Sequence, residues 1–142
     1  MLARASRALS HGSMGHMESG RVRVLIVDDQ DTFRQVAHLV VDLTDGFEVV
    51  GEAEDGETSV DMARALNPDL VLMDVNLPGI DGLEATRRIL AALDDVEVVV
   101  LSTYEPDEYA PRAAAAGAIA YIPKSTLDPE TLEAAWLAGA AT

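Results

Sequence analysis

The stretch VRVLIVDDQDTF, residues 22–33, joins an apolar run to a group of acidic residues. Its first six residues, Val22 to Val27, are mostly aliphatic and β-branched, which is typical of a strand buried on both faces of a parallel sheet. Two adjacent carboxylates, Asp28 and Asp29, follow this run directly. Neighbouring ionised carboxylates are costly to hold together unless a cation or a proton lies between them. The stretch therefore predicts a buried strand whose end requires a compensating positive charge.

The composition limits the class of protein. The chain has 142 residues, the size of one ordinary domain. Its formal net charge of −15 argues against a nucleic-acid-binding surface in this chain, because phosphate binding needs clustered Lys and Arg. The absence of cysteine excludes disulfides, thiolate zinc sites and cysteine nucleophiles. Charges interrupt every apolar run well before the roughly 20 residues of a membrane span, so we expect a cytoplasmic protein without a membrane partner.

Residues 1–20, MLARASRALSHGSMGHMESG, differ in composition from the rest of the chain. They are basic at first and then rich in Gly, Ser, His and Met, without a lasting period. Transit peptides are also rich in Arg and Ser, but a disordered tail, a tag remnant or an over-extended start is the simpler interpretation. We therefore assign residues 1–20 to such a segment and residues 21–142 to a single domain.

From Arg21 onward, short β-branched runs alternate with helical patterns. Five strands that alternate with five helices predict an α/β fold with a doubly wound parallel sheet. Asp29 or Asp31 is available as the N-cap of the first helix, and Asp128 as that of the last. The expected strands are 22–27, 47–53, 69–74, 96–102 and 118–122, and four of the expected helices are 31–44, 56–66, 83–93 and 129–138.

The remaining helix belongs to the segment 105–117, which contains Pro106, Pro111 and a run of alanines before Gly117. A proline inside a helix costs about 3 kcal/mol. We therefore expect this helix to begin near Pro111, with residues 106–110 as a loop. Alanine methyl groups bury little area at about 25 cal/mol per Å², so the helix is also expected to dock weakly.

Polar residues follow several of the expected strands. In doubly wound sheets, ligands bind outside the carboxyl ends of the strands. An all-oxygen cluster there suits Mg²⁺ or Mn²⁺ rather than zinc. A carboxylate in such a cluster can attack phosphorus when a metal ion, a lysine and a hydroxyl surround it. The residues expected on this edge are Asp28 and Asp29 after the first strand, Asp74 after the third, Ser102 after the fourth and Lys124 after the fifth.

Four motifs then recur in a known order: LIVDDQ (25–30), VLMDVNLPGIDGLE (71–84), VVVLST (98–103) and GAIAYIPKS (117–125). They resemble the successive motifs of the response-regulator receiver domain of two-component signalling. LSTYEPDEY (101–109) and YIPKS (121–125) resemble the NarL/FixJ subclass, whose receiver precedes a C-terminal helix-turn-helix DNA-binding domain. The resemblance implies a flavodoxin-like fold with strand order 2-1-3-4-5.

The resemblance also implies a role for each site residue. A sensor histidine kinase would be the partner, transcription would be controlled through a domain outside this chain, and a homodimer on phosphorylation would be one outcome. The implied roles are these: Asp74 as phosphoacceptor and metal ligand, Asp29 as direct ligand, Asp28 as ligand through water, Asn76 as ligand through its backbone carbonyl, Ser102 as switch hydroxyl, Lys124 as partner of the phosphoryl group, and Tyr121 as the aromatic whose rotamer follows Ser102.

Other interpretations of these residues and of the function stay open. In one alternative, Asp28 and Asp29 serve merely as caps of the first helix. In others, Lys124 is a solvated surface lysine and Tyr121 is a half-buried residue at the sheet edge, which for Tyr121 is as well supported as the functional role. The chain can be a stand-alone receiver or a phosphate-independent interaction module. A Mg²⁺-dependent phosphohydrolase is least favoured, because Asn76 stands where such enzymes usually place a second acid. We expect catalysis limited to self-phosphotransfer and autodephosphorylation rather than a metabolic reaction.

Overall fold

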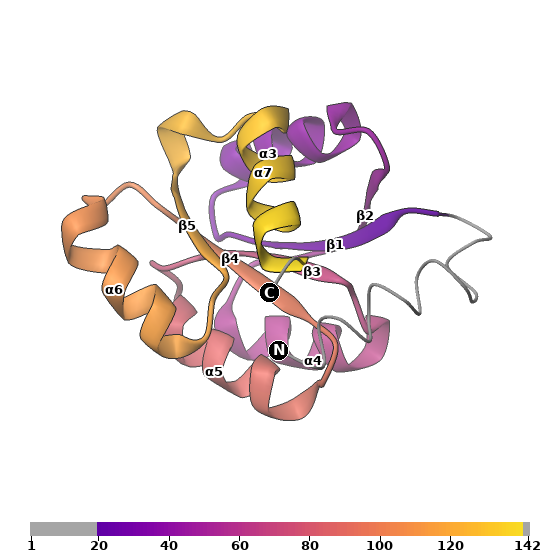
Figure 1. The fold of residues 1–142 in the computed structure, drawn as a ribbon. Helices are drawn as coiled ribbons and strands as arrows, with labels where there is room; N and C mark the ends of the chain where they lie inside the picture. Colours follow the sequence, from indigo (N-terminus) through magenta and orange to yellow (C-terminus); the bar gives the residue numbers. More distant parts are fainter. Residues whose placement is uncertain (1–19, 141–142) are drawn as a thin grey trace.

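Five parallel strands form one sheet in the order β2-β1-β3-β4-β5 (Figure 1). The structure is a computed structural model that describes residues 20–140, with side chains as far as Gly139. This order confirms the expected doubly wound, flavodoxin-like fold. The strands are β1 (Val22–Val27), β2 (Phe47–Ala53), β3 (Leu70–Asp74), β4 (Glu97–Ser102) and β5 (Ala120–Pro123).

Helices cover both faces of the sheet. In Figure 1, α3 and α7 lie above the sheet, whereas α4, α5 and α6 lie below it. None of the helices within residues 20–140 has the length and apolar character needed to cross a bilayer. The helices are α3 (Asp31–Leu43), α4 (Gly56–Leu66), α5 (Gly82–Ala92), α6 (Pro106–Ala116), the 3₁₀ helix η1 (Lys124–Thr126) and α7 (Pro129–Ala140).

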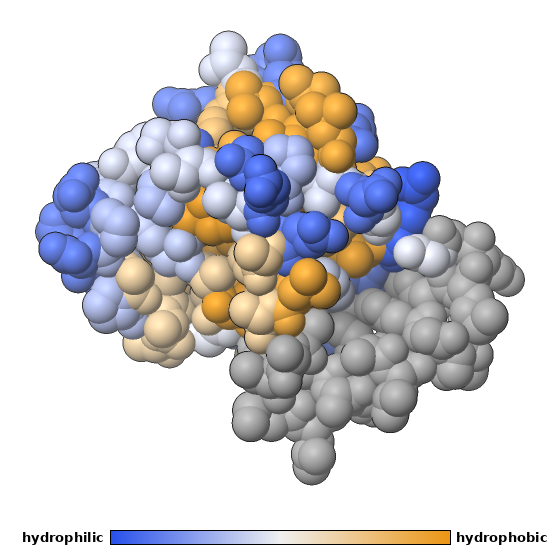
Figure 2. Space-filling view, turned by 45° about the horizontal axis from the view of Figure 1, so that its top comes forward, coloured by the Kyte–Doolittle hydropathy of each residue, from blue (hydrophilic) through white to orange (hydrophobic). Residues whose placement is uncertain are grey.

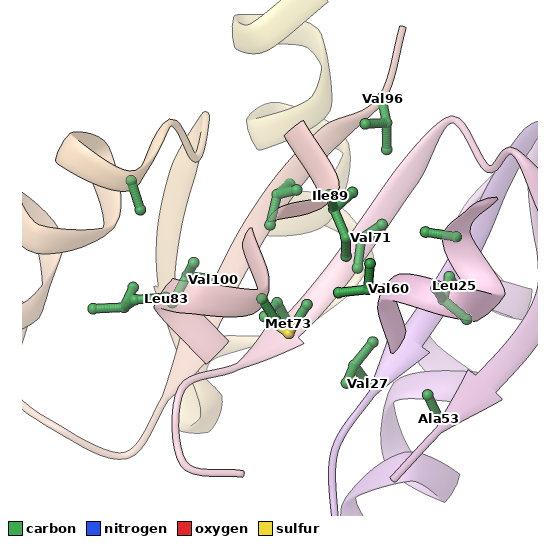
Figure 3. Close-up of a cluster of buried hydrophobic side chains, with 14 of the residues drawn as sticks. Leu25, Val27, Ala53, Val60, Val71, Met73, Leu83, Ile89, Val96 and Val100 are labelled. Atoms are coloured by element: carbon green, nitrogen blue, oxygen red, sulfur yellow. The ribbon is translucent and has the colours of Figure 1, made fainter. Parts of the chain in front are cut away.

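Alternate residues of the central strands supply two separate cores. Leu25 and Val27 of β1 point into the core between the sheet and helices α4, α5 and α6, which is drawn in Figure 3. Val24 and Ile26 of the same strand point into the core beneath α3 and α7. Because both faces are covered, the central strands read as nearly continuous aliphatic runs. This double burial fixes the strand ends, and therefore the residues that follow them, on a rigid edge.

The first helix is capped differently from the prediction. Neither Asp29 nor Asp31 is the N-cap of α3; Gln30 occupies that position and makes no capping bond with its side chain. The Gln30 backbone N–H instead donates to Asp28 Oδ1 at 2.8 Å. Asp31 lies inside the first turn, where its negative charge interacts favourably with the positive end of the helix dipole. Its carboxylate also forms an ion pair with Arg34. The side chains of Asp28 and Asp31 therefore bond a backbone N–H and an arginine near the start of α3, and neither acts as its N-cap.

The helix that contains Pro111 begins earlier than predicted. The expected loop 106–110 is helical, and α6 starts at Pro106 with Pro111 in its interior. Pro106 suits the first helical position, and Glu105 O accepts bonds from the N–H groups of Glu108 and Tyr109 at 3.2 and 3.3 Å. Tyr109 also stacks on Tyr104, with ring centroids 4.6 Å apart. These local contacts offset the single helical bond that Pro111 cannot make.

The outer side of α3 carries several apolar side chains. Apolar residues recur along α3 at helical spacing, but they do not all face the core. Val36 and Leu43 are 48% and 65% exposed. Leu39 of the same helix and Leu137 of α7 are also exposed. The space-filling view, in which this side comes forward, shows hydrophobic surface gathered toward the top (Figure 2). The inward positions are taken by Ala37, Val40, Val41 and the buried Arg34.

Candidate functional site

Three carboxylates meet at the carboxyl edge of the sheet. β1 and β3 are neighbouring parallel strands, so the residues that end them lie side by side. Asp28, Asp29 and Asp74 each offer an oxygen within 4.8 Å of those of the other two. Asp28 and Asp74 are buried, whereas Asp29 is exposed. The three residues therefore lie together at this edge, as the sequence predicts.

Lys124 brings a positive charge to the same place. It is the first residue of η1, the turn that directly follows β5. Its Nζ lies 2.6 Å from Asp28 Oδ2 and 3.5 Å from Asp74 Oδ1. The Lys124 side chain is only 10% exposed. It is thus a largely covered partner of the acidic cluster and not a solvated surface lysine.

Asp74 is the carboxyl group with the most strongly shifted pKa at this site. Burial, reinforced by the negative charge of Asp28, raises the pKa of Asp74 from 3.8 to about 6. The Lys124 ammonium and the Asn76 backbone act in the opposite direction and lower this pKa. At neutral pH, Asp74 is therefore mainly ionised but is held in surroundings that favour neutralisation of its charge.

Ser102 and Asn76 complete a small polar cavity. Ser102 ends β4 and is 2% exposed, and Asn76 lies exposed in the loop after β3. The cavity has a volume of about 130 Å³ and is lined by Asp29, Gln30, Asp74, Asn76, Ser102, Thr103 and Lys124. It is large enough for a small ion or a phosphoryl group with water, and its walls carry hydrogen-bonding groups.

Tyr121 lies outside this cavity, in contact with the loop that follows β4. Its hydroxyl donates to the backbone carbonyl of Tyr104, and its side chain is half-buried on β5. The backbone N–H of the same Tyr104 donates to Ser102 Oγ at 2.9 Å. Ser102 and Tyr121 are therefore joined through one peptide segment, although they do not share the cavity.

Two further residues at the site were not found from the sequence: Phe33 and Arg34. Arg34 is buried, and its Nη1 donates to the backbone carbonyl of Asp28 at 2.7 Å. The Phe33 ring lies beneath the Lys124 ammonium, with Nζ 4.4 Å from the ring centroid. The helical period could have indicated both, because the first turn of a helix that follows a strand end faces back toward that end.

Gly82 was also missed. It opens α5, and its backbone N–H donates to Val75 O at 2.8 Å. A Cβ at this position would lie 2.0 Å from the carbonyl oxygen of Asp74. Any side chain here would therefore displace the backbone of Asp74, and glycine allows the helix to approach the site this closely.

The donor set fits a hard divalent cation. Three carboxylates face one ammonium, so the described cluster carries excess negative charge. Burial raises the pKa of Asp74, and the negative charge of Asp28 raises it further. The available donors are carboxylate and carbonyl oxygens, which suit Mg²⁺ or Mn²⁺. One carboxylate, Asp29, is open to solvent and leaves room for coordinated water.

Comparison with known proteins agrees with this arrangement. Residues 24–136 match the response regulator receiver domain family. The chain is 45% identical over 114 residues to response regulator GacA of Pseudomonas viridiflava, and the match covers 80% of this chain and 53% of that protein. The chain thus spans about half the length of the curated relatives it matches.

Two solved structures share the fold. A LuxR-family two-component response regulator from Aurantimonas sp. SI85-9A1 superposes with a TM-score of 0.77 at 32% identity, covering 85% of this chain and 86% of that chain. The signal receiver domain of the response regulator NarL from Mycobacterium tuberculosis also gives a TM-score of 0.77, at 28% identity, covering 85% of this chain and 97% of that chain.

Proposed function

The chain belongs to the response regulator receiver domain family, and on that premise we propose that Asp74 accepts a phosphoryl group from a sensor histidine kinase. One observation carries the proposal. Asp74 is a buried carboxylate of the acidic cluster that lies 3.5 Å from Lys124 Nζ, and unlike Asp28 it lines the cavity that also contains Ser102. An attacking carboxylate needs this combination of a cation, a hydroxyl and space for the phosphoryl oxygens.

The transfer is a displacement at phosphorus in which Asp74 is the nucleophile. A carboxylate oxygen of Asp74 forms the new O–P bond, and the P–N bond to the kinase imidazole breaks with its electron pair remaining on nitrogen. Asp28, Asp29, Asp74 and the backbone carbonyl of Asn76 would hold Mg²⁺ or Mn²⁺, which when bound neutralises charge on the phosphoryl oxygens. Slow hydrolysis of the same bond would return the chain to its starting state.

Lys124 and Ser102 respond to the new charge. Lys124 Nζ is already 3.5 Å from Asp74 Oδ1 and needs only a small movement to pair with a phosphoryl oxygen. The Ser102 hydroxyl accepts a bond from Tyr104 N–H and still carries its own proton, which it can donate toward the cavity. Movement of Ser102 would disturb the Tyr104 peptide and, through it, the hydrogen bond of Tyr121.

The output is proposed from the relatives. The match covers only 53% of GacA, which is about one and a half times as long as this chain, and the Aurantimonas structure is a LuxR-family regulator. We infer that phosphorylation of Asp74 controls transcription through a C-terminal DNA-binding domain, with association of two chains as one way to transmit the change. A stand-alone receiver uses the same site, whereas a phosphate-independent interaction module does not.

Fluorine NMR with beryllofluoride, a phosphoryl mimic, tests the proposal. Wild-type protein should show a protein-bound fluoride signal in the presence of Mg²⁺ and lose it with EDTA. Asp74→Asn should show no bound signal, and Asp29→Asn should require a much higher Mg²⁺ concentration. Thr32→Ala, on an exposed position of α3 outside the cavity, is the matched control and should behave as wild type. A wild-type protein that binds neither Mg²⁺ nor beryllofluoride would instead be an interaction module.

A further inference from the structure

We propose that Phe33 is a positioning residue for Lys124, whose ammonium it holds against its ring so that the charge stays beside Asp74. The proposal rests on the proposed function for its consequence in phosphoryl transfer, but the positioning itself is a property of the folded chain. Lys124 Nζ lies 4.4 Å from the centroid of the Phe33 ring, within the range of a cation–π contact.

The contact completes the surroundings of an ammonium that is largely shielded from solvent. An ammonium has three N–H donors, and two oxygens lie near this one: Asp28 Oδ2 at 2.6 Å and Asp74 Oδ1 at 3.5 Å. The Lys124 side chain is 10% exposed, so little water reaches it. The electron-rich ring face is the third neighbour, and it is attractive to a cation that has lost most of its hydration.

The ring matters because Lys124 shares its nearest carboxylate. Asp28 is both the 2.6 Å partner of Lys124 and a member of the acidic cluster that fits a divalent cation. Any cation at that cluster competes with the ammonium for Asp28. The ring offers Lys124 a contact outside that competition, and it keeps the ammonium close to Asp74 when the bond to Asp28 weakens.

Phe33 itself is held firmly. Its ring packs against the core beneath α3 and α7. The next residue, Arg34, ties the first turn of α3 to its surroundings through Asp28 O at 2.7 Å, Asp31 Oδ1 at 2.7 Å and Glu52 Oε1 at 3.2 Å. The ring therefore has a fixed position from which to orient a long and otherwise flexible side chain.

The sequence allows a direct test, because Lys124 is the sole lysine of the chain. NMR of protein made with isotope-labelled lysine reports this side chain alone. The ε-methylene protons of wild type should be shifted upfield by the ring current. Phe33→Leu, which keeps an apolar side chain but removes the ring, should return them to an ordinary position, whereas Phe33→Tyr should retain the shift. Phe47→Leu removes the other phenylalanine of the chain and serves as the matched control.

Phosphorylation by acetyl phosphate gives the second measurement. Phe33→Leu should slow the reaction about thirtyfold, the size expected for one desolvated cation–π contact, and Phe33→Tyr should restore most of the rate. In a Lys124→Met background, Phe33→Leu should have no further effect, whereas a merely structural role would slow both backgrounds equally. An unshifted lysine signal in wild type, or equal slowing in both backgrounds, overturns the proposal. A shifted signal in a wild type that accepts no phosphate would overturn the proposed function alone.

Discussion

Asp74 carries its charge in a place where burial and the neighbouring Asp28 both disfavour it. The raised pKa means that the folded state binds a proton at Asp74 more tightly than the unfolded chain does. Stability contributed by this group is therefore present at low pH and is lost as the pH rises from about 3.8 towards 6. Without a bound cation, the ionised Asp74 therefore lowers the free energy of unfolding at neutral pH. Removing its charge should raise that free energy again.

Asp74→Asn should accordingly stabilise the protein without added metal. The shift of about two pKa units corresponds to about 3 kcal/mol in the free energy of unfolding near pH 7.5, and to about half of that near pH 5. Urea unfolding of wild type and variant at both pH values, in EDTA, measures the difference. Asp31→Asn, an exposed carboxylate of α3, is the control and should show no such gain. An Asp74→Asn gain that does not shrink at the lower pH would be inconsistent with a raised pKa.

The helix α6 buries only small side chains against the core. Among its residues only Ala113 and Ala116 are buried, and each contributes a single methyl group. At about 25 cal/mol per Å², such small side chains bury little stabilising area. Pro111 further leaves the carbonyl of Asp107 without its helical donor. Elements with few buried contacts open or shift at low cost, which suits a segment that must respond to Asp74.

Pro111→Ala should strengthen α6 by about 1 to 3 kcal/mol, because it restores one helical bond and removes the clash of the ring. Native-state amide exchange should show slower exchange between Glu108 and Ala116. Pro106→Ala in the same helix is the control, since Pro106 is at the first helical position and no helical bond is regained there. Equal protection in both variants would show that Pro111 does not limit the stability of α6.

The elements could be predicted where a pattern of apolar residues decides them. The aliphatic runs of β1 and β3 and the alternation with helices were sufficient for the sheet and its carboxyl edge. The start of α6 was predicted wrongly, because the stacking of Tyr104 on Tyr109 is a contact that propensity does not contain. The exposure of Val36, Leu39 and Leu43 on α3 could not be predicted, since a helical period does not say which of two apolar sides faces the core.

Among the site residues, the sequence indicated those that end a strand, such as Asp74 and Ser102. It did not indicate Phe33, Arg34 or Gly82, whose importance lies in distances across the fold. An aromatic ring, an arginine and a glycine each have many ordinary uses. Only the three-dimensional structure shows that one lies against Lys124, one bonds Asp28 O and one touches the backbone of Asp74.

At the scale of the whole molecule, cations are scarce and their placement is informative. The chain has 25 acidic residues against 10 basic ones, and its sole lysine lies at the acidic cluster. Such a balance leaves the chain itself poorly suited to bind nucleic acid. The relatedness to LuxR-family and NarL proteins confirms the resemblance to the NarL/FixJ subclass. DNA contact would then belong to another domain.

The mobile output face is predicted to lie between Ser102 and Tyr121. A bound phosphoryl mimic changes the contacts of Ser102 and Lys124, and the Tyr104 peptide links Ser102 to Tyr121. Amide hydrogen exchange with and without beryllofluoride should therefore change in α6 and β5 and the loops beside them. Changes confined to α3 and α4, with none between Ser102 and Tyr121, would rule out this route. Lys124→Met should reduce the response in that region.

Phosphorylation of Asp74 should depend on a divalent cation. Intact-mass spectrometry of the protein after incubation with acetyl phosphate and Mg²⁺ measures it. Wild type should gain one phosphoryl group, whereas wild type in EDTA and Asp74→Asn should gain none. An Asp74→Asn protein that gains one phosphoryl group as efficiently as wild type would show that Asp74 is not the acceptor.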